Sequence, residues 1–397
     1  MAKKRTSARQ ISSATKVTAV MQLICNMKLK EFIRSWEEEL PLQLQASYDN
    51  CGLIVGDPDQ EITGFLTCLD CTEAVVEEAA RLKVNVIIAH HPVVFSGLKH
   101  INQKHWVERT VRAAIKLDIA IYASHTNLDH HYDGVNRVIC ERLGVKNCTA
   151  LSPQKDILYG IRVFVPADSM EQVLSAMFAA GAGRLGNYDE CSFSLTGEGT
   201  FRPLEGANPT TGNIGLRETL QENQLNLICT RWQLSRVLAA MRTAHPYEEI
   251  AYELVQLENT AHFYGAGMVG ELEQETDSAA FMQMVAKTMR CAVIRHTSPL
   301  GKPIKRVAVC GGSGYSLLGN AISAGADIFL TADIKYHEFF EADQQIILAD
   351  IGHYESEQFT IQHLIDRLKK KFPTFAAHST GVLTNPVQYT IVHGNKE

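Results

Sequence analysis

Short apolar runs alternate with helix-like segments throughout residues 28–150, and this alternation restricts the possible fold more than any other feature of the sequence. The runs GFLTCLD, VNVIIA and IAIYASH have the length and composition of buried strands. Between them, TEAVVEEAARLK and WVERTVRAAIKLD have helical spacing, and Thr72 is predicted to cap the first of these helices. Strands that alternate with helices in this way predict a largely parallel sheet with helices on both faces.

Residues 263–397 repeat this style after an interruption of different character. Strands are predicted in KRVAVC, ADIFLTAD and QQIILAD, and one long amphipathic helix is predicted over 355–372. We therefore predict a discontinuous α/β domain formed by residues 28–154 and 263–397. Residues 155–262 follow the order strand, helix, strand, strand, helix, strand, which is typical of an inserted ferredoxin-like α+β domain.

Residues 1–27 are predicted to lie outside the fold. The first 26 residues hold five basic residues and no acidic residue and are rich in Ser and Thr, which is typical of a transit peptide. The run VTAVMQLIC weakly resembles the apolar part of a signal peptide. We favour a third interpretation, in which the natural chain begins at Met27 and the upstream residues come from an earlier start codon.

Charge and cysteine usage narrow the functional classes. The net charge is −6, and the basic tail makes the rest of the chain more acidic still, which argues against a nucleic-acid surface. The ten cysteines lie mostly within apolar runs of a chain too long to need disulfides, which indicates reduced thiols and a cytoplasmic location. No apolar stretch approaches the roughly 18 residues required to span a bilayer, so we expect no membrane partner.

Side chains able to bind metal follow several of the predicted strands. His90 and His91 come directly after VNVIIA, Asp129 follows the IAIYASHTN region, and His353 and Glu357 follow QQIILAD. Ligands bind at the carboxyl ends of strands in open α/β sheets, because the loops there converge on one edge. We therefore expect the fold to bring these residues together.

The spacing of these residues favours a centre with two ions. His353 and Glu357 are four residues apart at the start of a helix, so both face the same way. His90 and His91 are adjacent in extended backbone, where side chains diverge, and so suit two different ions. Asp129 and Glu357 would then complete or bridge the two sites, with the ions about 3.5 to 4 Å apart. Taken alone, the histidine pair also fits a capping or core feature.

Three other motifs are weaker. Cys68 and Cys71 form a single CxxC motif, which we interpret as a strand-end turn and helix cap rather than a redox or zinc site. The run CGGSGYS after KRVAVC fits either an anion site built from backbone N–H groups or a tight strand-to-helix turn. The run HPYEE at 245–249 is interpreted as a turn.

A family resemblance is carried, in chain order, by SYDNCGLIVGD, IIAHHPVVFSGLKHI, SHTNLDHHYDGVN, AVCGGSGYSLL, LTADIKYHEFFEA and DIGHYESE. These motifs, spread over residues 28–390, resemble those of the Nif-three-like family, whose members are named GTP cyclohydrolase 1 type 2 homologues or dinuclear metal centre proteins. The insert is similar to the PII-like or CutA-like domain of the longer bacterial members.

The resemblance implies a metal centre and an assembly. Two divalent ions of zinc, iron, manganese or nickel are implied, with Glu357 as the bridge. Their ligands would be His90, His91, Asp129, His353 and Glu357. The resemblance also implies a toroidal homohexamer, with the metal sites facing an internal cavity and the insert covering openings of the ring.

Two functions fit these expectations. The first is a metal-dependent hydrolase that activates water on a nucleotide-like or other small substrate; with GTP, the water would attack C8 of the purine and open the ring. Proton transfer or phosphate contacts would fall to Asp333, Lys335, His337 and His125, although Lys335 also fits a solvated loop charge. The second is a metal-binding regulatory or scaffold ring protein whose insert senses a small molecule or a partner.

Overall fold

The computed structural model describes residues 27–390, which fall into two compact units. The first unit comprises the described residues up to Ser152 and those from Ala266, and the second spans Pro153–Gly265. The N-terminal extension predicted for residues 1–27 lies outside the described residues, apart from Met27. Among residues 27–390, no helix combines the length and the apolar character needed to cross a membrane.

The first unit contains two sheets, and the first of these has five strands in the order β1-β4-β3-β2-β15. Strands β4, β3, β2 and β15 run parallel, whereas β1 joins the edge antiparallel to β4. Side chains alternate between two buried faces, as a covered parallel sheet requires, so Phe65 and Leu66 enter different cores. The bounds are Gly52–Val55 (β1), Gly64–Cys68 (β2), Val86–Ala89 (β3), Ala120–Ala123 (β4) and Ala376–Ser379 (β15).

The second sheet of this unit has six strands in the order β11-β14-β13-β12-β10-β5. Its three middle strands β14, β13 and β12 run parallel, and β11 and β10 pair antiparallel with their neighbours β14 and β12. The bounds are Val145–Gln154 (β5), Ala261–Thr276 (β10), Arg295–His296 (β11), Ile304–Val309 (β12), Ile328–Thr331 (β13) and Ile347–Asp350 (β14).

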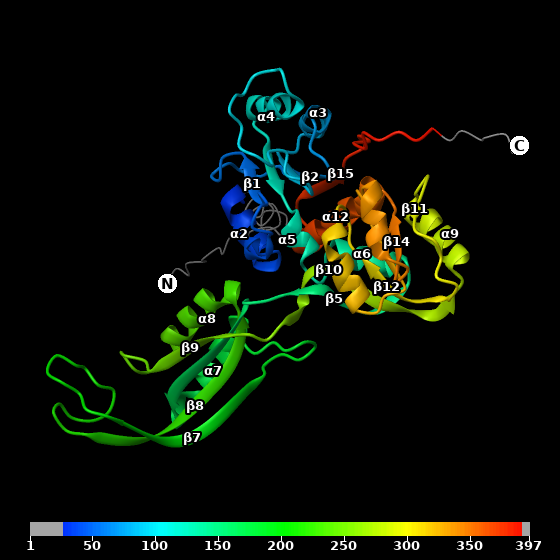
Figure 1. Cartoon of the computed structure of the whole chain (residues 1–397). Coiled ribbons are helices and arrows are strands. Elements are labelled where there is room, and N and C mark those ends of the chain that lie inside the picture. Colours follow the sequence, from blue (N-terminus) through cyan, green and yellow to red (C-terminus); the bar gives the residue numbers. More distant parts are fainter. Residues whose placement is uncertain (1–26, 391–397) are drawn as a thin grey trace, which may run out of the picture. The chain divides into compact units, whose positions relative to one another are not determined.

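The two halves of the sequence exchange one strand each. Strand β15, from the C-terminal half, pairs with β2 of the first sheet, and β5, from the N-terminal half, forms the edge of the second sheet beside β10 (Figure 1). The predicted two-half α/β fold is therefore confirmed, and it is built as two interlocked sheets rather than one.

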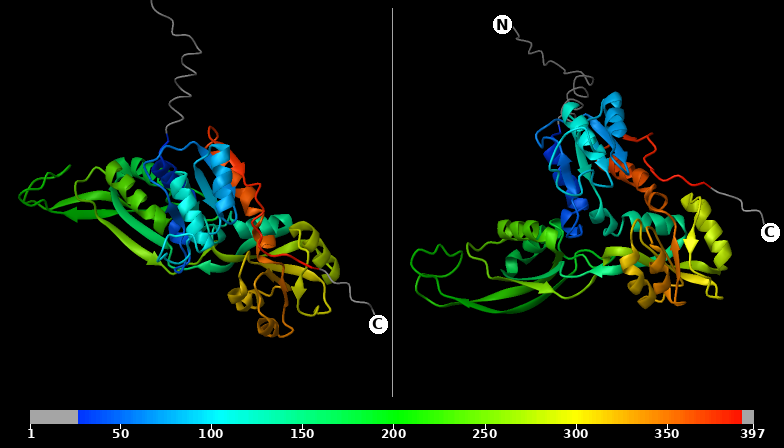
Figure 2. Two further views of the ribbon diagram at one scale, coloured as in Figure 1. Left: turned by 90° about the horizontal axis from the view of Figure 1, so that it is seen from above. Right: turned by 45° about the horizontal axis from the view of Figure 1, so that its top comes forward.

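Helices cover both faces of each sheet, as the two views in Figure 2 show. Helices α3 (Glu73–Leu82) and α4 (Trp106–Lys116) pack on one face of the first sheet. The opposite face and one face of the second sheet share a single larger core with α2 (Leu29–Glu39), α6 (Val135–Arg142), α9 (Ser278–Met289) and α12 (Thr360–Lys371). The remaining face of the second sheet is covered by α10 (Leu318–Ser323) and by 3-10 helices at Tyr315–Leu317 and Tyr336–Ala342.

The second unit has the ferredoxin-like topology. Its elements follow the predicted βαββαβ order, and its four strands pair antiparallel in the order β7-β8-β6-β9. Both helices pack on one face of this sheet through a core that includes Val173 and Val237. The bounds are Leu158–Pro166 (β6), Met170–Ala179 (α7), Ser192–Phe201 (β7), Glu218–Thr230 (β8), Arg231–Ala244 (α8) and Tyr252–Leu257 (β9).

Two local predictions were wrong. The segment 355–372 does not form one helix: α11 (His353–Glu357) ends before α12 begins, and Gln358 and Phe359 separate them. This break divides a short helix with polar side chains from a helix that buries Leu364 and Leu368 in the shared core. Thr72 occupies the N-cap position of α3, but its side chain makes no capping hydrogen bond.

Candidate metal centre

His90 and His91 follow the last residue of β3 at a bend in the backbone. Their N–H groups donate to the carbonyl oxygens of Cys68 and Leu69 at 3.0 and 2.9 Å, so pairing with the chain after β2 persists through both histidines. The two ring centroids are only 4.9 Å apart, so the prediction that these side chains diverge was wrong. Both imidazoles face Glu357, His90 toward Oε1 and His91 toward Oε2.

His90 is fully buried, and its Nδ1 lies 2.8 Å from the carbonyl oxygen of Ser124. Because a carbonyl only accepts hydrogen bonds, Nδ1 carries the proton and Nε2 presents a lone pair. This Nε2 lies 3.7 Å from Asp129 Oδ1 and 3.8 Å from Glu357 Oε1. His90 Nε2 and Asp129 Oδ1 are both buried without a hydrogen-bond partner. A cation between them would satisfy both atoms, which proteins rarely leave unpaired.

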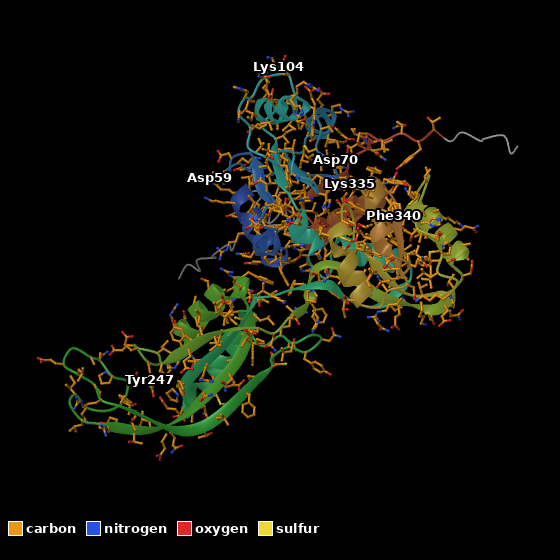
Figure 3. The ribbon with its side chains drawn as sticks, in the orientation of Figure 1. Asp59, Asp70, Lys104, Tyr247, Lys335 and Phe340 are labelled. Atoms are coloured by element: carbon orange, nitrogen blue, oxygen red, sulfur yellow. The ribbon has the colours of Figure 1, made fainter. Side chains whose placement is uncertain are left out.

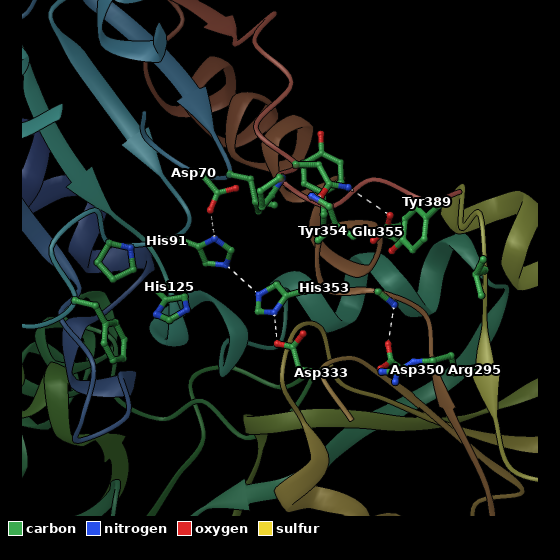
Figure 4. A pocket seen from close by; sticks show the side chains of 18 of the residues that line it. Asp70, His91, His125, Arg295, Asp333, Asp350, His353, Tyr354, Glu355 and Tyr389 are labelled. Carbon is green, nitrogen blue, oxygen red and sulfur yellow. Dashed lines mark hydrogen bonds and ion pairs between the residues drawn. The ribbon is translucent and has the colours of Figure 1, made fainter. Parts of the chain in front are cut away.

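His91 and His353 converge on the carboxylate of Glu357. The two Nε2 atoms are 3.3 Å apart, and they lie 3.0 and 3.2 Å from Glu357 Oε2. Each ring is held from behind, because Nδ1 of His91 is 2.8 Å from Asp70 Oδ1 and Nδ1 of His353 is 2.7 Å from Asp333 Oδ2. Figure 4 shows these four residues, Asp70, His91, His353 and Asp333, joined in a line. Carboxylates placed behind imidazoles in this way orient metal-binding histidines in proteins.

Glu357 stands between two groups of donor atoms. Its Oε1 faces His90 and its Oε2 faces His91 and His353, and its side chain is only 3% exposed. The donor atoms of His91, His353 and Glu357 all lie within 4.8 Å of one another, and so do those of His90, His91 and His125. The position of Glu357 is that of a carboxylate able to serve two ions.

The glycines after β12 make room for these ligands. Gly312 has a φ of +62°, and a Cβ atom there would lie 2.5 Å from Glu357 Oε1 and 3.2 Å from His353 Nε2. The N–H groups of the three glycines in this loop donate to side chains, so we interpret the loop as a tight turn next to the candidate ligands. The pairs are Gly311 with Asn136 Oδ1, Gly312 with Ser356 Oγ and Gly314 with Thr331 Oγ1.

Burial and paired charges set the proton affinities of the cluster. Burial lowers the pKa of His91, but hydrogen bonds to its two carboxylate partners outweigh this and raise the pKa to about 9. The same balance raises the pKa of His353 to about 11. Burial opposes ionisation of Glu357, yet the three imidazoles around it hold its pKa well below the usual range. Burial, followed by the neighbouring Glu357 carboxylate, raises the pKa of Asp129 to about 7.

Helix α5 (Thr126–Asp129) is a single turn that begins after His125 and ends at Asp129. Nδ1 of His125 lies 2.8 Å from Asp49 Oδ1, and Asp49 also accepts a hydrogen bond from the N–H of Thr126 at 3.0 Å. Although burial opposes it, these hydrogen bonds hold the pKa of Asp49 below its usual range. His125 is thus fixed in orientation close to His90 and His91.

A cavity of about 670 Å³ opens beside these residues within the first unit. His91, His125 and His353 form part of its lining together with Asp333. The remaining lining combines apolar side chains, among them Phe95 and Trp106, with polar ones. Figure 4 shows four of the other lining residues, Asp70, Arg295, Tyr354 and Tyr389.

Lys335 and His337 do not line this cavity. The side chain of Lys335 is 85% exposed and pairs with Glu338 at 3.6 Å. His337 stacks on Phe340 in the exposed 3-10 helix after β13. Figure 3 labels Lys335 and Phe340 in this segment. Asp333 lines the cavity, but its carboxylate is engaged by His353. Of the four residues predicted to transfer protons or contact phosphate, the structure therefore brings Asp333 and His125 to the cavity.

Three charged residues of the site were not selected from the sequence. Asp70 follows β2, so the strand-end reasoning applied to His90 also applies to it. Asp49 lies in a loop before β1 and carries no periodic signal. Arg295, in the two-residue strand β11, donates to Asp350 and, at 3.0 Å, to the carbonyl oxygen of Ile334.

The fold and the site together define a two-sheet α/β protein with clustered histidines and a glutamate able to hold metal ions. The sequence profile of the Duf34/NIF3 (NGG1p interacting factor 3) family matches residues 27–386, and the chain belongs to this family.

Individual relatives cover almost the whole chain. A Halalkalibacterium halodurans protein named GTP cyclohydrolase 1 type 2 homolog is 37% identical over 340 residues, which are 85% of this chain and 91% of the relative. A Staphylococcus epidermidis protein of the same name is 33% identical over 371 residues, or 91% of this chain and 100% of the relative. The crystal structure of a Bacillus cereus protein related to NIF3 is similar with a TM-score of 0.83 at 34% identity, covering 92% of this chain and 99% of that one. The family resemblance of the motifs is therefore confirmed.

Proposed function

We propose that this chain is a metal-dependent hydrolase that uses two divalent ions to activate water on a nucleotide-like or other small substrate. The main support is the pair of buried, unsatisfied atoms, His90 Nε2 and Asp129 Oδ1, beside the Glu357 carboxylate. A histidine that only packed in the core would be expected to find partners for both ring nitrogens within the protein.

The donors suit transition-metal ions. Imidazole nitrogen and carboxylate oxygen accept zinc, iron, manganese or nickel. His90, Asp129 and Oε1 of Glu357 would hold one ion, and His91, His353 and Oε2 of Glu357 would hold the other. In each histidine Nε2 is the donor, because Nδ1 is held by a carbonyl or a carboxylate. When bound, two such ions lower the pKa of water toward about 7 and polarise an electrophilic carbon or phosphorus centre.

Other side chains of the cavity fit a substrate with a planar base and a phosphate. His125 is fixed by Asp49 through Nδ1, so we assign its Nε2 to proton transfer. Arg295 lies in the lining with a side chain 56% exposed, and we assign its guanidinium, which also pairs with Asp350, to a phosphate contact. Phe95 and Trp106 supply apolar surface against which a planar ring can stack.

The shared name of the relatives makes GTP the first nucleotide to test. In a cyclohydrolase reaction water adds to C8 of the purine and the bond between C8 and N9 breaks, which opens the ring. His125 would move the proton in this step. Lys335 and His337 lie away from the cavity lining, so we assign them no part in it.

The experiment combines metal counting with a substrate screen. Protein stripped by a chelator is reloaded with zinc, iron, manganese or nickel, and the bound metal is measured by mass spectrometry. Each loaded form is incubated with GTP, other nucleotides and a metabolite extract, and depletion is followed by liquid chromatography. We expect two ions per chain and depletion of at least one compound.

The double change His90→Ala with Glu357→Ala should abolish both metal loading and depletion. The matched control His100→Ala removes an exposed imidazole outside the cavity lining and should retain both. Turnover by the double variant at the rate of the unchanged chain would refute the proposal.

A regulatory or scaffold role is the second candidate, and one feature of the insert favours it. The ferredoxin-like unit has its own cavity of about 330 Å³, lined by Phe201, Glu222 and Tyr247 among other residues, which has room for a small molecule. In this role the ions would order a homohexamer, the assembly that the family resemblance implies. Light scattering of the double variant separates the two candidates. If the variant dissociates, and no metal-loaded form of the unchanged chain depletes any compound, the scaffold role is favoured. If the variant stays a hexamer but loses the turnover of the unchanged chain, catalysis is favoured.

A further inference from the structure

The last described residues, 380–390, form a strap across the first unit, which we call the C-terminal strap. It begins directly after β15, where Thr380 donates its N–H to the carbonyl oxygen of Thr67 at 2.9 Å. Its root is held by Glu78 of α3, which accepts hydrogen bonds from the hydroxyl of Thr380 and, at 3.0 Å, from the N–H of Gly381. The strap is thus anchored to the first sheet and its helix layer.

The strap then reaches the opposite side of the cavity. Asn385 Nδ2 donates to Glu355 Oε1 at 3.4 Å, and Figure 4 shows Tyr389 beside the same carboxylate. Glu355 belongs to α11, the helix that carries His353 and Glu357. Four strap residues line the cavity: Asn385, Pro386, Val387 and Tyr389. The strap therefore forms a wall of the cavity and contacts elements that follow strands of both sheets.

Between these two attachments, Thr384 contacts the partner of a candidate metal ligand. The hydroxyl of Thr384 donates to Asp70 Oδ2 at 3.1 Å, while Asp70 Oδ1 lies 2.8 Å from Nδ1 of His91. Both carboxylate oxygens are used, so the hydroxyl restricts rotation of the carboxylate about its last bond. The side chain of Asp70 is 32% exposed, so without this hydroxyl water would compete for the carboxylate.

We propose that Thr384 is a positioning residue of the metal centre, acting through Asp70 on His91. This inference rests on the proposed function, because it takes His91 as a metal ligand. Carboxylates behind metal-binding histidines change metal affinity by about 10–100-fold when removed. Thr384 acts one hydrogen bond further out, and we expect a smaller effect, about 3–10-fold.

This role of Thr384 also couples docking of the C-terminal strap to the affinity of the centre for metal. If the strap strengthens the binding of a metal ion, the ion must stabilise the docked strap by the same factor, because binding linkage is reciprocal. Leu383 is 71% exposed next to Thr384, which makes the bond after it accessible to chymotrypsin when the strap undocks.

The test uses the full chain, stripped of metal and titrated with Co²⁺, whose visible absorption reports the ligands around the ion. Thr384→Val removes the hydroxyl and keeps the shape of the side chain, and Thr384→Ser restores the hydroxyl. Thr243→Val makes the same chemical change in the second unit, at an exposed residue of α8 whose hydroxyl donates to the carbonyl oxygen of Ala239 at 3.0 Å. Thermal unfolding of the metal-free variants checks that each one folds.

We expect Thr384→Val to weaken Co²⁺ binding by about 3–10-fold and to shift the absorption band, with Thr384→Ser and Thr243→Val close to the unchanged chain. Co²⁺ should also slow chymotryptic cleavage after Leu383, and less so in Thr384→Val. Co²⁺ binding by Thr384→Val equal to that of the unchanged chain, or an equal loss in Thr243→Val, would overturn the role of Thr384 while leaving the metal centre in place. Absence of Co²⁺ binding by the unchanged chain would overturn the proposed function as well.

Discussion

The change Asp129→Asn should stabilise the metal-free protein and reduce the stabilisation that metal ions give it. Asp129 is 18% exposed, and its Oδ1 has no hydrogen-bond partner and faces His90 at 3.7 Å. Burial and the nearby Glu357 carboxylate raise its pKa to about 7 in the folded chain, against about 3.9 for an unperturbed aspartate. The ionised carboxylate is therefore tolerated poorly unless a cation lies beside it.

The size of the effect follows from this difference in pKa. When the folded-state pKa of a carboxyl is raised, its stabilising contribution is fully present below the unfolded pKa and is lost as pH rises through the folded pKa. From about 3.9 to about 7 this loss amounts to about 4 kcal/mol, complete near pH 8. Because water reaches part of the side chain, we expect Asp129→Asn to recover about 2–4 kcal/mol at pH 8 and nothing below pH 4.

Urea denaturation of both proteins, with chelator and with added Zn²⁺, measures this. In chelator at pH 8, Asp129→Asn should have the higher free energy of unfolding. Zn²⁺ at 100 times the dissociation constant of each site should add about 2.7 kcal/mol for each bound ion. The variant keeps the complete ligand set of only one ion, so Zn²⁺ should stabilise it about half as much as the unchanged chain, which reduces the difference. The control Asp118→Asn changes an exposed aspartate at a φ of 54°, which Asn tolerates, and should alter neither result. Destabilisation of the metal-free Asp129→Asn protein by more than about 1 kcal/mol at pH 8 would refute this reasoning.

Four further changes test other parts of the site and fold. Glu357→Gln keeps the shape but removes the charge that both groups of donors share, so both ions should bind at least about 100-fold more weakly; His90→Ala should weaken only one of the two steps in a calorimetric titration. Gly312→Ala adds a Cβ at a φ of +62° and 2.5 Å from Glu357 Oε1, so urea denaturation should show a loss of about 2 kcal/mol or more. Burial raises the pKa of Asp327, but Lys302 and two backbone N–H groups outweigh this and lower the pKa. The ionised carboxylate therefore stabilises the fold above the pKa of the unfolded state, and this stabilisation is lost as pH falls through the pKa of the folded state. Asp327→Asn should therefore cost about 1–2 kcal/mol at pH 7 in urea denaturation, and this cost should shrink as the pH falls through the lowered pKa of Asp327.

The strand ends that carry the candidate ligands were predictable because a strand and the residue after it form one local pattern. An apolar run such as VNVIIA predicts a buried strand, and polar side chains directly behind it must then leave the core at the carboxyl end. The same reasoning places His353 and Glu357 after β14. The single helix predicted over 355–372 joined part of α11 to α12, because periodicity alone does not separate two helices that are only two residues apart.

The partners behind the imidazoles were not predictable in this way. Asp49 and Thr384 are isolated polar residues in irregular segments, 76 and 293 residues from the histidines that they hold or influence. The position of Thr384 depends on the pairing of β15 with β2, which brings the C-terminal strap beside Asp70. The position of Asp49 depends on the pairing of β1 with β4, which brings the loop before β1 beside His125. Hydrophobic periodicity describes the faces of one element and contains no information about which distant elements become neighbours.

The candidate ligands come from both sheets of the first unit, which raises the question of whether metal ions are needed for folding. His90, His91 and Asp129 follow strands of the first sheet, and His353 and Glu357 follow a strand of the second, so bound ions would join the two sheets. Structural zinc sites have this effect in small domains that are unfolded without metal. Here one continuous apolar core, which includes Phe65 of the first sheet and Val307 of the second, already packs the sheets together. Because this core does not depend on the ions, the metal-free chain should stay folded, and the buried, unsatisfied carboxylate of Asp129 is not needed to hold the two sheets together.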